Sequence, residues 1–176
     1  AATTSNGKLT LSTLGNLIAG ANADLTVTAA TAGSLASTLT LALTSNARGI
    51  ADLTNEALTS KTVAVTGTAY DYARATLANT SLALGNVRTG DQASVGVTNT
   101  VTTSASFQDS LDVVASSANG KLTLSNPANI LAGNTGNVGF TAFAAGSLDA
   151  TVALALTSNA NNIGNLSDLG LTGQSI

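Results

Sequence analysis

The stretch NGKLTLS at residues 6–12 decides the fold class, because the same seven residues return at 119–125. A second stretch, LALTSNA, occupies 41–47 and returns at 154–160 with the same offset of 113 residues. Two landmarks with one offset indicate an internal repeat, which is the first feature to establish in a sequence because it sets the architecture.

Within the first stretch, Leu9 and Leu11 alternate with Lys8 and Thr10. This period of two predicts a strand with one buried face. The preceding Asn6-Gly7 predicts a tight turn of type I′, since that turn needs a positive φ at both central residues.

The same alternation continues along the chain. It predicts strands at 25–29, 35–45, 62–70, 81–87, 93–99 and around 107–115. Leu39, Leu41 and Leu43 are expected on the inner face of the longest strand, and Val95 and Val97 on the inner face of another. Short strands at spacings of roughly 8 to 12 residues are typical of an all-β sandwich or barrel.

The segments between these strands are rich in Gly, Asn and Ser. We expect a loop at 14–23 anchored by buried Leu17 and Ile18. A polar loop is expected at 45–60, with a short helical turn near 52–58. Arg88 to Asp91 is expected to form a turn in which Gly90 takes a positive φ.

Composition restricts the function classes. Charged residues make up 9 % of the chain, against about 25 % in an ordinary soluble domain. Thr, Ser and Asn must therefore form the polar surface. The net charge is −3 with six Lys plus Arg, and without a basic run there is no patch for nucleic acid. No apolar run approaches the roughly 20 residues of a membrane-spanning helix.

The chain contains no Cys, His or Met, so a disulfide framework and a Ser-His-Asp triad are excluded. Nucleotide-binding glycine motifs are absent. The carboxylates lie in no distinctive motif, and solvated surface is the interpretation we favour for them. Asp109 and Asp112 lack the spacing of a calcium loop. Lys8 and Lys121 share one repeat position and are interpreted as solvated charges that protect a strand edge. We expect no enzyme activity and no cofactor.

The runs LGNVRTGDQASVGVTNT at 84–100 and VTGTAY at 65–70 resemble the opening and closing strands of choice-of-anchor D modules. These modules are related to the ASPM, SPD-2 and hydin domains. The resemblance implies immunoglobulin-like β-sandwich modules in tandem, as in exported bacterial surface proteins. It implies no catalytic residues.

Residues 1–63 align without a gap on 114–176, and about 29 positions are identical. Against the resembled module, 1–73 is a back half with its closing strand, truncated at its front. Residues 74–176 form a module that lacks its last strand. Because an unpaired strand edge leaves N–H and C=O groups open, both units are expected to need a partner.

Two origins for this partner remain open. The chain is either an excerpt of a longer array, whose neighbouring modules complete both units, or a subunit completed by strands from other copies. The second origin gives a head-to-tail filament. We expect the open edge for a partner strand at Gln174, Ser175 and Ile176, and the module junction at Tyr70, Asp71 and Tyr72. The two tyrosines are expected to pack the junction.

The sequence therefore predicts a non-enzymatic, extracellular or cell-surface structural protein, secreted by a bacterium, that acts as a stalk, matrix fibre or adhesin module. The start at Ala1 suggests a processed or excised product. A carbohydrate-binding β-sandwich module is the alternative, and a glycan would then be the partner.

Overall fold

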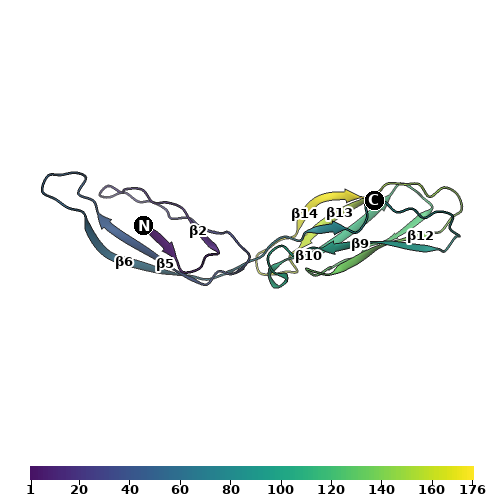
Figure 1. Ribbon diagram of the computed structural model, residues 1–176, viewed down its shortest axis with the longest axis horizontal. Helices are drawn as coiled ribbons and strands as arrows, with labels where there is room; N and C mark the ends of the chain where they lie inside the picture. Colours follow the sequence, from purple (N-terminus) through teal and green to yellow (C-terminus); the bar gives the residue numbers. More distant parts are fainter. The chain divides into compact units, whose positions relative to one another are not determined.

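The computed structural model describes all 176 residues and is all-β. It contains no α-helix and one short 3-10 turn, η1 (Ala105–Phe107). The chain divides into two compact units, which we call the first unit (Ala1–Tyr70) and the second unit (Asp71–Ile176). All strand pairs in both units are antiparallel (Figure 1).

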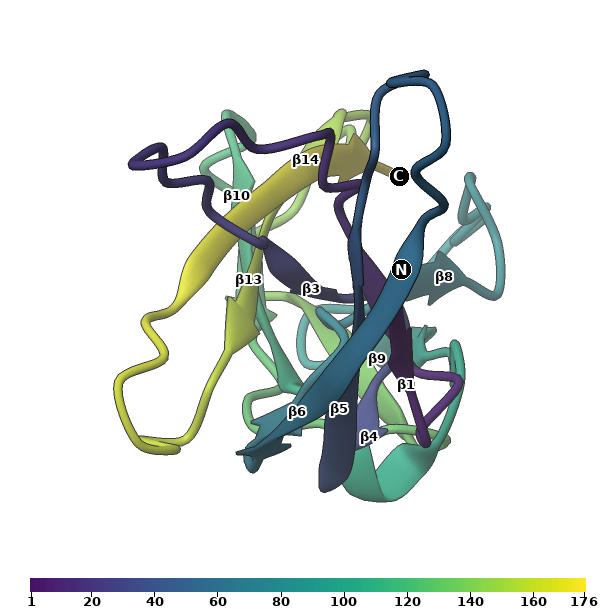
Figure 2. The ribbon, with the colours of Figure 1, turned by 90° about the vertical axis from the view of Figure 1, so that its left-hand side faces the viewer.

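The first unit has three small sheets, with strand orders β1-β5-β6, β2-β3 and β4-β7. Figure 2 shows β5 and β6 as a long, twisted pair of strands. The strands are β1 (Ala2–Thr4), β2 (Leu9–Leu11), β3 (Val27–Ala29), β4 (Gly33–Ser34), β5 (Ser37–Ser45), β6 (Glu56–Val65) and β7 (Thr68–Ala69).

The second unit has a four-stranded sheet, β11-β12-β9-β8, and a three-stranded sheet, β10-β13-β14. Its strands are β8 (Ala75–Leu77), β9 (Gln92–Asn99), β10 (Ser110–Ser117), β11 (Leu122–Ser125), β12 (Thr135–Ala142), β13 (Val152–Asn159) and β14 (Leu169–Ser175).

The sequence repeat is also a repeat of register. Ala2 pairs with Leu41, and its counterpart Ala115 pairs with Leu154. The β5–β6 and β13–β14 pairs both shift register within the LALTSNA stretch, between Leu41 and Leu43 and between Leu154 and Leu156. The two copies of the repeat therefore form the same strand pairing, including the register shift.

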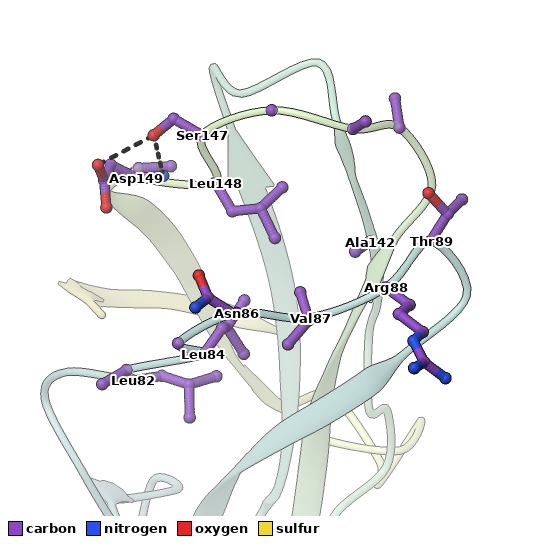
Figure 3. Close-up of a pocket in the computed structure, with 16 residues that line it drawn as sticks. Leu82, Leu84, Asn86, Val87, Arg88, Thr89, Ala142, Ser147, Leu148 and Asp149 are labelled. Atoms are coloured by element: carbon purple, nitrogen blue, oxygen red, sulfur yellow. Dashed lines mark hydrogen bonds between the residues drawn. The ribbon is translucent and has the colours of Figure 1, made fainter.

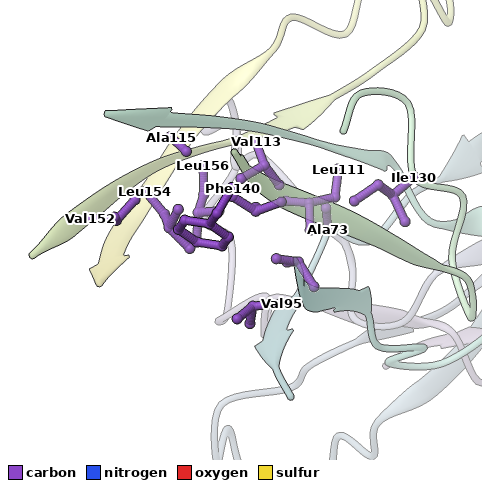
Figure 4. Packing of buried hydrophobic residues seen from close by; sticks show 12 residues of the cluster. Ala73, Val95, Leu111, Val113, Ala115, Ile130, Phe140, Val152, Leu154 and Leu156 are labelled. Atoms are coloured by element: carbon purple, nitrogen blue, oxygen red, sulfur yellow. The ribbon is translucent and has the colours of Figure 1, made fainter. Parts of the chain in front are cut away.

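The core of the second unit collects side chains from both of its sheets (Figure 4). Alternating residues of β9, β10, β12 and β13 point inward, as expected for strands with one buried face. Val95 and Val97 are fully buried, as the sequence predicted. The cluster comprises Ala73, Val95, Val97, Leu111, Val113, Ala115, Ile130, Val138, Phe140, Val152, Leu154 and Leu156.

Several expectations about local structure are wrong. Residues 81–87 form no strand, and the strand that begins this part of the chain is β8. The polar segment 45–60 holds no helical turn around 52–58, because Glu56–Val65 is the strand β6 paired with β5. Tertiary pairing overrides the weak local preference of this Thr-rich and Ser-rich segment.

The Asn-Gly turns also differ from the expectation. Neither Asn6 nor Gly7 has a positive φ, so the turn is not type I′. The Asn6 side chain instead accepts a hydrogen bond from the N–H of Lys8, at 3.0 Å. By contrast, Gly90 has φ 97° and the N–H of Asp91 donates to the carbonyl of Arg88, as expected for that turn.

Candidate functional site

The first unit has an open apolar face where the second unit is closed. Leu43 is 38 % exposed, whereas its repeat counterpart Leu156 is 3 % exposed. Leu17 is 54 % exposed, whereas its counterpart Ile130 is 5 % exposed. The expectation that Leu17 and Ile18 are buried anchors is therefore wrong. Of the three leucines expected on the inner face of β5, only Leu39 is buried.

Strand length explains this exposure. In the second unit, β10 covers β13 from Val152 to Asn159. The corresponding strand of the first unit, β1, covers β5 only from Leu39 to Leu41. The N–H of Ala42 donates to the carbonyl of Ala1. Past Ala42, no strand pairs with the edge of β5 that faces β1.

The second unit is open at a different place. A groove of about 970 Å³ lies between the segment 82–89 and the segment 144–150. In Figure 3, Leu148 extends from one wall toward the other, which carries Leu82, Leu84 and Val87. No aromatic side chain lines this groove.

The first unit shows what can lie against such a wall. There, β7 pairs with β4, with Gly33 opposite Ala69 and Ser34 opposite Thr68, and the N–H of Leu35 donates to the carbonyl of Gly67 at 2.9 Å. The second unit contains no counterpart of β7.

Burial follows the presence of β7. Ala32 and Gly33 are buried in the first unit, whereas their counterparts Ala145 and Gly146 are exposed in the second. Each unit is therefore open at the place where the other is closed.

Both walls have the same internal bonding. Asn119 donates from its side-chain amide to the carbonyls of Ser147 and Asp149, at 3.3 and 3.2 Å. Asn6 makes the equivalent pair of bonds to Ser34 and Ala36 in the first unit. The wall of the groove is therefore held in shape without a neighbouring strand.

Lys121 and Lys8 have a local role at these walls. A Cβ placed on Gly146 would collide with Nζ of Lys121, and one on Gly33 would collide with Nζ of Lys8. Both lysines are half-buried. Each side chain lies across a glycine with φ near 126° or 129°, and the interpretation of Lys8 and Lys121 as solvated charges that protect a strand edge stays a prediction.

A buried polar network supports one end of the second core. Asn99 donates to the carbonyls of Asp109 and Ile130, both at 2.9 Å, and accepts from Gln108. Ser158 accepts from the N–H of Ala73 and donates to Oδ2 of Asp109, both at 2.8 Å. Oδ1 of Asp109 is buried and has no hydrogen-bond partner.

This network was not predicted from the sequence, since its members come from distant segments. Its carboxylate does not form a metal site with Asp112, which accepts from the backbone of Asn129 and the side chain of Asn159. The structure contains no cluster of three or more acidic residues that could hold a metal ion.

The residues predicted at the junction lie at the boundary of the units, which falls between Tyr70 and Asp71. Asp71 is bonded within the second unit, where its N–H donates to Phe107 and its carboxylate accepts from Thr102. Tyr72 is 59 % exposed.

The residues predicted at the open edge, Gln174, Ser175 and Ile176, lie in and just after β14. Gln174 and Ser175 pair with Leu154 and Ala153 of β13, and Ile176 exchanges two backbone bonds with Val152. No strand pairs with the other edge of β14.

The structure has no helix with the length and hydrophobicity of a membrane-spanning segment. No family model, curated protein or solved structure shows a significant match to the chain.

Proposed function

We propose that the chain is a non-enzymatic structural protein of the cell surface or extracellular matrix, built from immunoglobulin-like β-sandwich modules that assemble through β-strand pairing with neighbouring modules or chains. The observation that carries the proposal is the complementary openness of the two units. Identical sequence is buried in one unit and exposed in the other, according to which strands are present.

The energetics favour a partner at these places. Burying one leucine side chain contributes about 1.5–3 kcal/mol, and Leu43 and Leu17 are both substantially exposed. The same face ends in an unpaired strand edge, and such edges are templates for another strand. A strand that covered this face would gain main-chain hydrogen bonds and apolar burial together.

The geometry of the proposed assembly is head to tail. The open face of the first unit lacks front strands, while the groove of the second unit lacks a closing strand, so each opening accepts strands from a different part of a neighbouring module or chain. Contacts between different surfaces are heterologous and propagate into filaments unless they close into a ring. A stalk, matrix fibre or adhesin shaft uses this kind of contact.

The surface composition and the resemblance to choice-of-anchor D modules also support the proposal. A surface dominated by Thr, Ser and Asn, with 9 % charged residues, suits a secreted repeat protein. The function of such a protein lies in how its modules assemble and in the distance that the assembly spans.

Sedimentation velocity of the purified chain over a wide concentration range tests the proposal. We expect concentration-dependent association that Leu43→Lys weakens, because a charge on the open face opposes strand docking. Leu131→Lys is the matched control, since Leu131 is 54 % exposed and lies outside both openings. A chain that remains monomeric throughout, or equal effects of the two variants, would contradict assembly through this face. Saturable binding on a glycan array by such a monomer would favour the carbohydrate-binding alternative.

A further inference from the structure

We infer that the groove of the second unit is an acceptor for one extended, uncharged β-strand with the pattern Val-Thr-Gly-Thr-x-Tyr, the pattern of Val65–Tyr70. The inference rests on the proposed function and identifies the chemistry of the partner at one of its two openings. The sequence contains this pattern once, and that copy is already paired with β4.

The first unit provides the template for the complex. Its β7 pairs beside Gly33 and Ser34, and the carbonyl of Gly67 accepts from the N–H of Leu35. The counterparts in the groove wall are Gly146, Ser147 and Leu148. The N–H of Leu148 has no hydrogen-bond partner in the chain, so the group that would receive the donor strand is available.

The acceptor wall already has the conformation of the occupied wall. Gly33 and Gly146 have φ 126° and 129°. The N–H of Lys8 donates to Asn6 at 3.0 Å, and the N–H of Lys121 donates to Asn119 at the same distance. Binding to a preformed wall avoids part of the ordering cost that lowers affinity.

The groove also lies in line with β14. Ile176 pairs with Val152, and its counterpart Val63 pairs with Leu39. In the first unit, Val65 then pairs with Ser37, and the chain reaches the wall at Gly67. A donor strand in the groove would therefore extend the line of β14 along the next backbone groups of the 144–150 segment.

The glycine of the donor pattern sets its specificity. Gly67 has φ 155°, and a Cβ built there would lie 3.8 Å from Cδ1 of Leu35. A β-branched residue does not adopt this φ without strain. Since Leu148 holds the place of Leu35, a donor with valine instead of glycine should dock poorly.

A synthetic peptide with the sequence of Val63–Tyr70 tests the inference on the full chain. We expect the Leu148 amide to exchange about tenfold more slowly at a free peptide concentration ten times the Kd. The matched control is the same peptide with Gly67→Val, for which we expect no protection. Unchanged exchange at Leu148, or equal protection by both peptides, overturns the inference.

Attaching the donor strand covalently to the chain makes its docking independent of the affinity of a free peptide. The sequence of Ala64–Tyr70 is added directly after Ile176, because Ile176 corresponds to Val63 in the repeat. We expect this chain to protect the Leu148 amide and to lose binding of the free peptide, whereas the same extension with Gly67→Val does neither. An extended chain that binds the peptide as the parent does overturns the inference.

These outcomes separate the two proposals. Peptide binding by a chain that never associates would leave the groove as an acceptor but refute assembly between chains. Association that persists without peptide binding would refute the acceptor and leave assembly to the open face of the first unit.

Discussion

Truncation of the two equivalent leucines, Leu156→Ala and Leu43→Ala, probes the open face directly. Both residues occupy the same place in the LALTSNA stretch and the same register position, opposite Leu171 and Leu58. They differ in environment, since Leu156 is 3 % exposed and Leu43 is 38 % exposed. The pair therefore compares one side chain in a closed core and in an open one.

The expected magnitudes follow from burial. The change removes three carbon groups, each worth about 0.8 kcal/mol when buried. At Leu156 nearly all of this transfer energy is lost and a cavity adds to it, so we expect a loss of about 2–5 kcal/mol. At Leu43 roughly two thirds of the transfer energy is lost and no closed cavity forms, so about 1–2 kcal/mol is expected.

Native-state hydrogen exchange is the assay, because the two units can unfold separately and a single Tm would mix them. Amides of β13 report on Leu156→Ala and amides of β5 on Leu43→Ala. Equal losses of opening free energy in the two variants would refute the argument, since they would mean that Leu43 is as well packed as Leu156. The measurement is made at a concentration where the chain is monomeric.

Two further predictions concern the second unit. Ser158→Ala should lower its free energy of unfolding by about 1–3 kcal/mol, because Asp109 and the N–H of Ala73 lose a buried hydrogen-bond partner. Ser45→Ala, at the exposed counterpart, should change the free energy of unfolding of the first unit by less than about 0.5 kcal/mol. Denaturant unfolding followed by hydrogen exchange measures both variants, and equal effects would contradict the assigned network. Asn119→Ala removes three hydrogen bonds of the groove wall and should weaken binding of the Val63–Tyr70 peptide, which calorimetry measures. The control Asn126→Ala removes one hydrogen bond outside the groove and should weaken binding less. Identical affinities of the two variants would show that Asn119 does not hold the wall.

The sequence predicted the all-β class and much of the strand pattern. Alternation of apolar and polar residues located β2, β5 and β13 in the repeat and β9 between its two copies, because a strand with one buried face has a period of two. It also identified Val95 and Val97 as core residues.

Exposure could not be predicted in the same way. Leu43 and Leu156 have identical neighbours in sequence from Leu41 to Ala47 and from Leu154 to Ala160, yet one is exposed and the other buried. The difference comes from β10, which covers Leu156 but lies far from it in the sequence. Its counterpart in the first unit, β1, is too short to cover Leu43. Local pattern tells which face is apolar, but not whether another strand covers it.

The groove and the buried network also depend on distant segments. The groove joins residues 82–89 to 144–150, and the segment 81–87 was predicted as a strand. The Asn99, Asp109 and Ser158 network joins three segments whose polar residues look like ordinary surface in the sequence. The absence of a second Val-Thr-Gly-Thr-x-Tyr pattern was the one signal that pointed to the groove.

Each unit is open where particular strands are missing from the chain, and we propose that pairing with such strands closes it. The most direct test places a copy of the Asp71–Val113 sequence immediately before Ala1, in frame with the repeat, and measures amide exchange at Leu43, Thr44 and Ser45. We expect these amides to become as protected as those of Leu156, Thr157 and Ser158 in the same chain. Exchange as fast as in the parent chain, with the second unit folded, would contradict it.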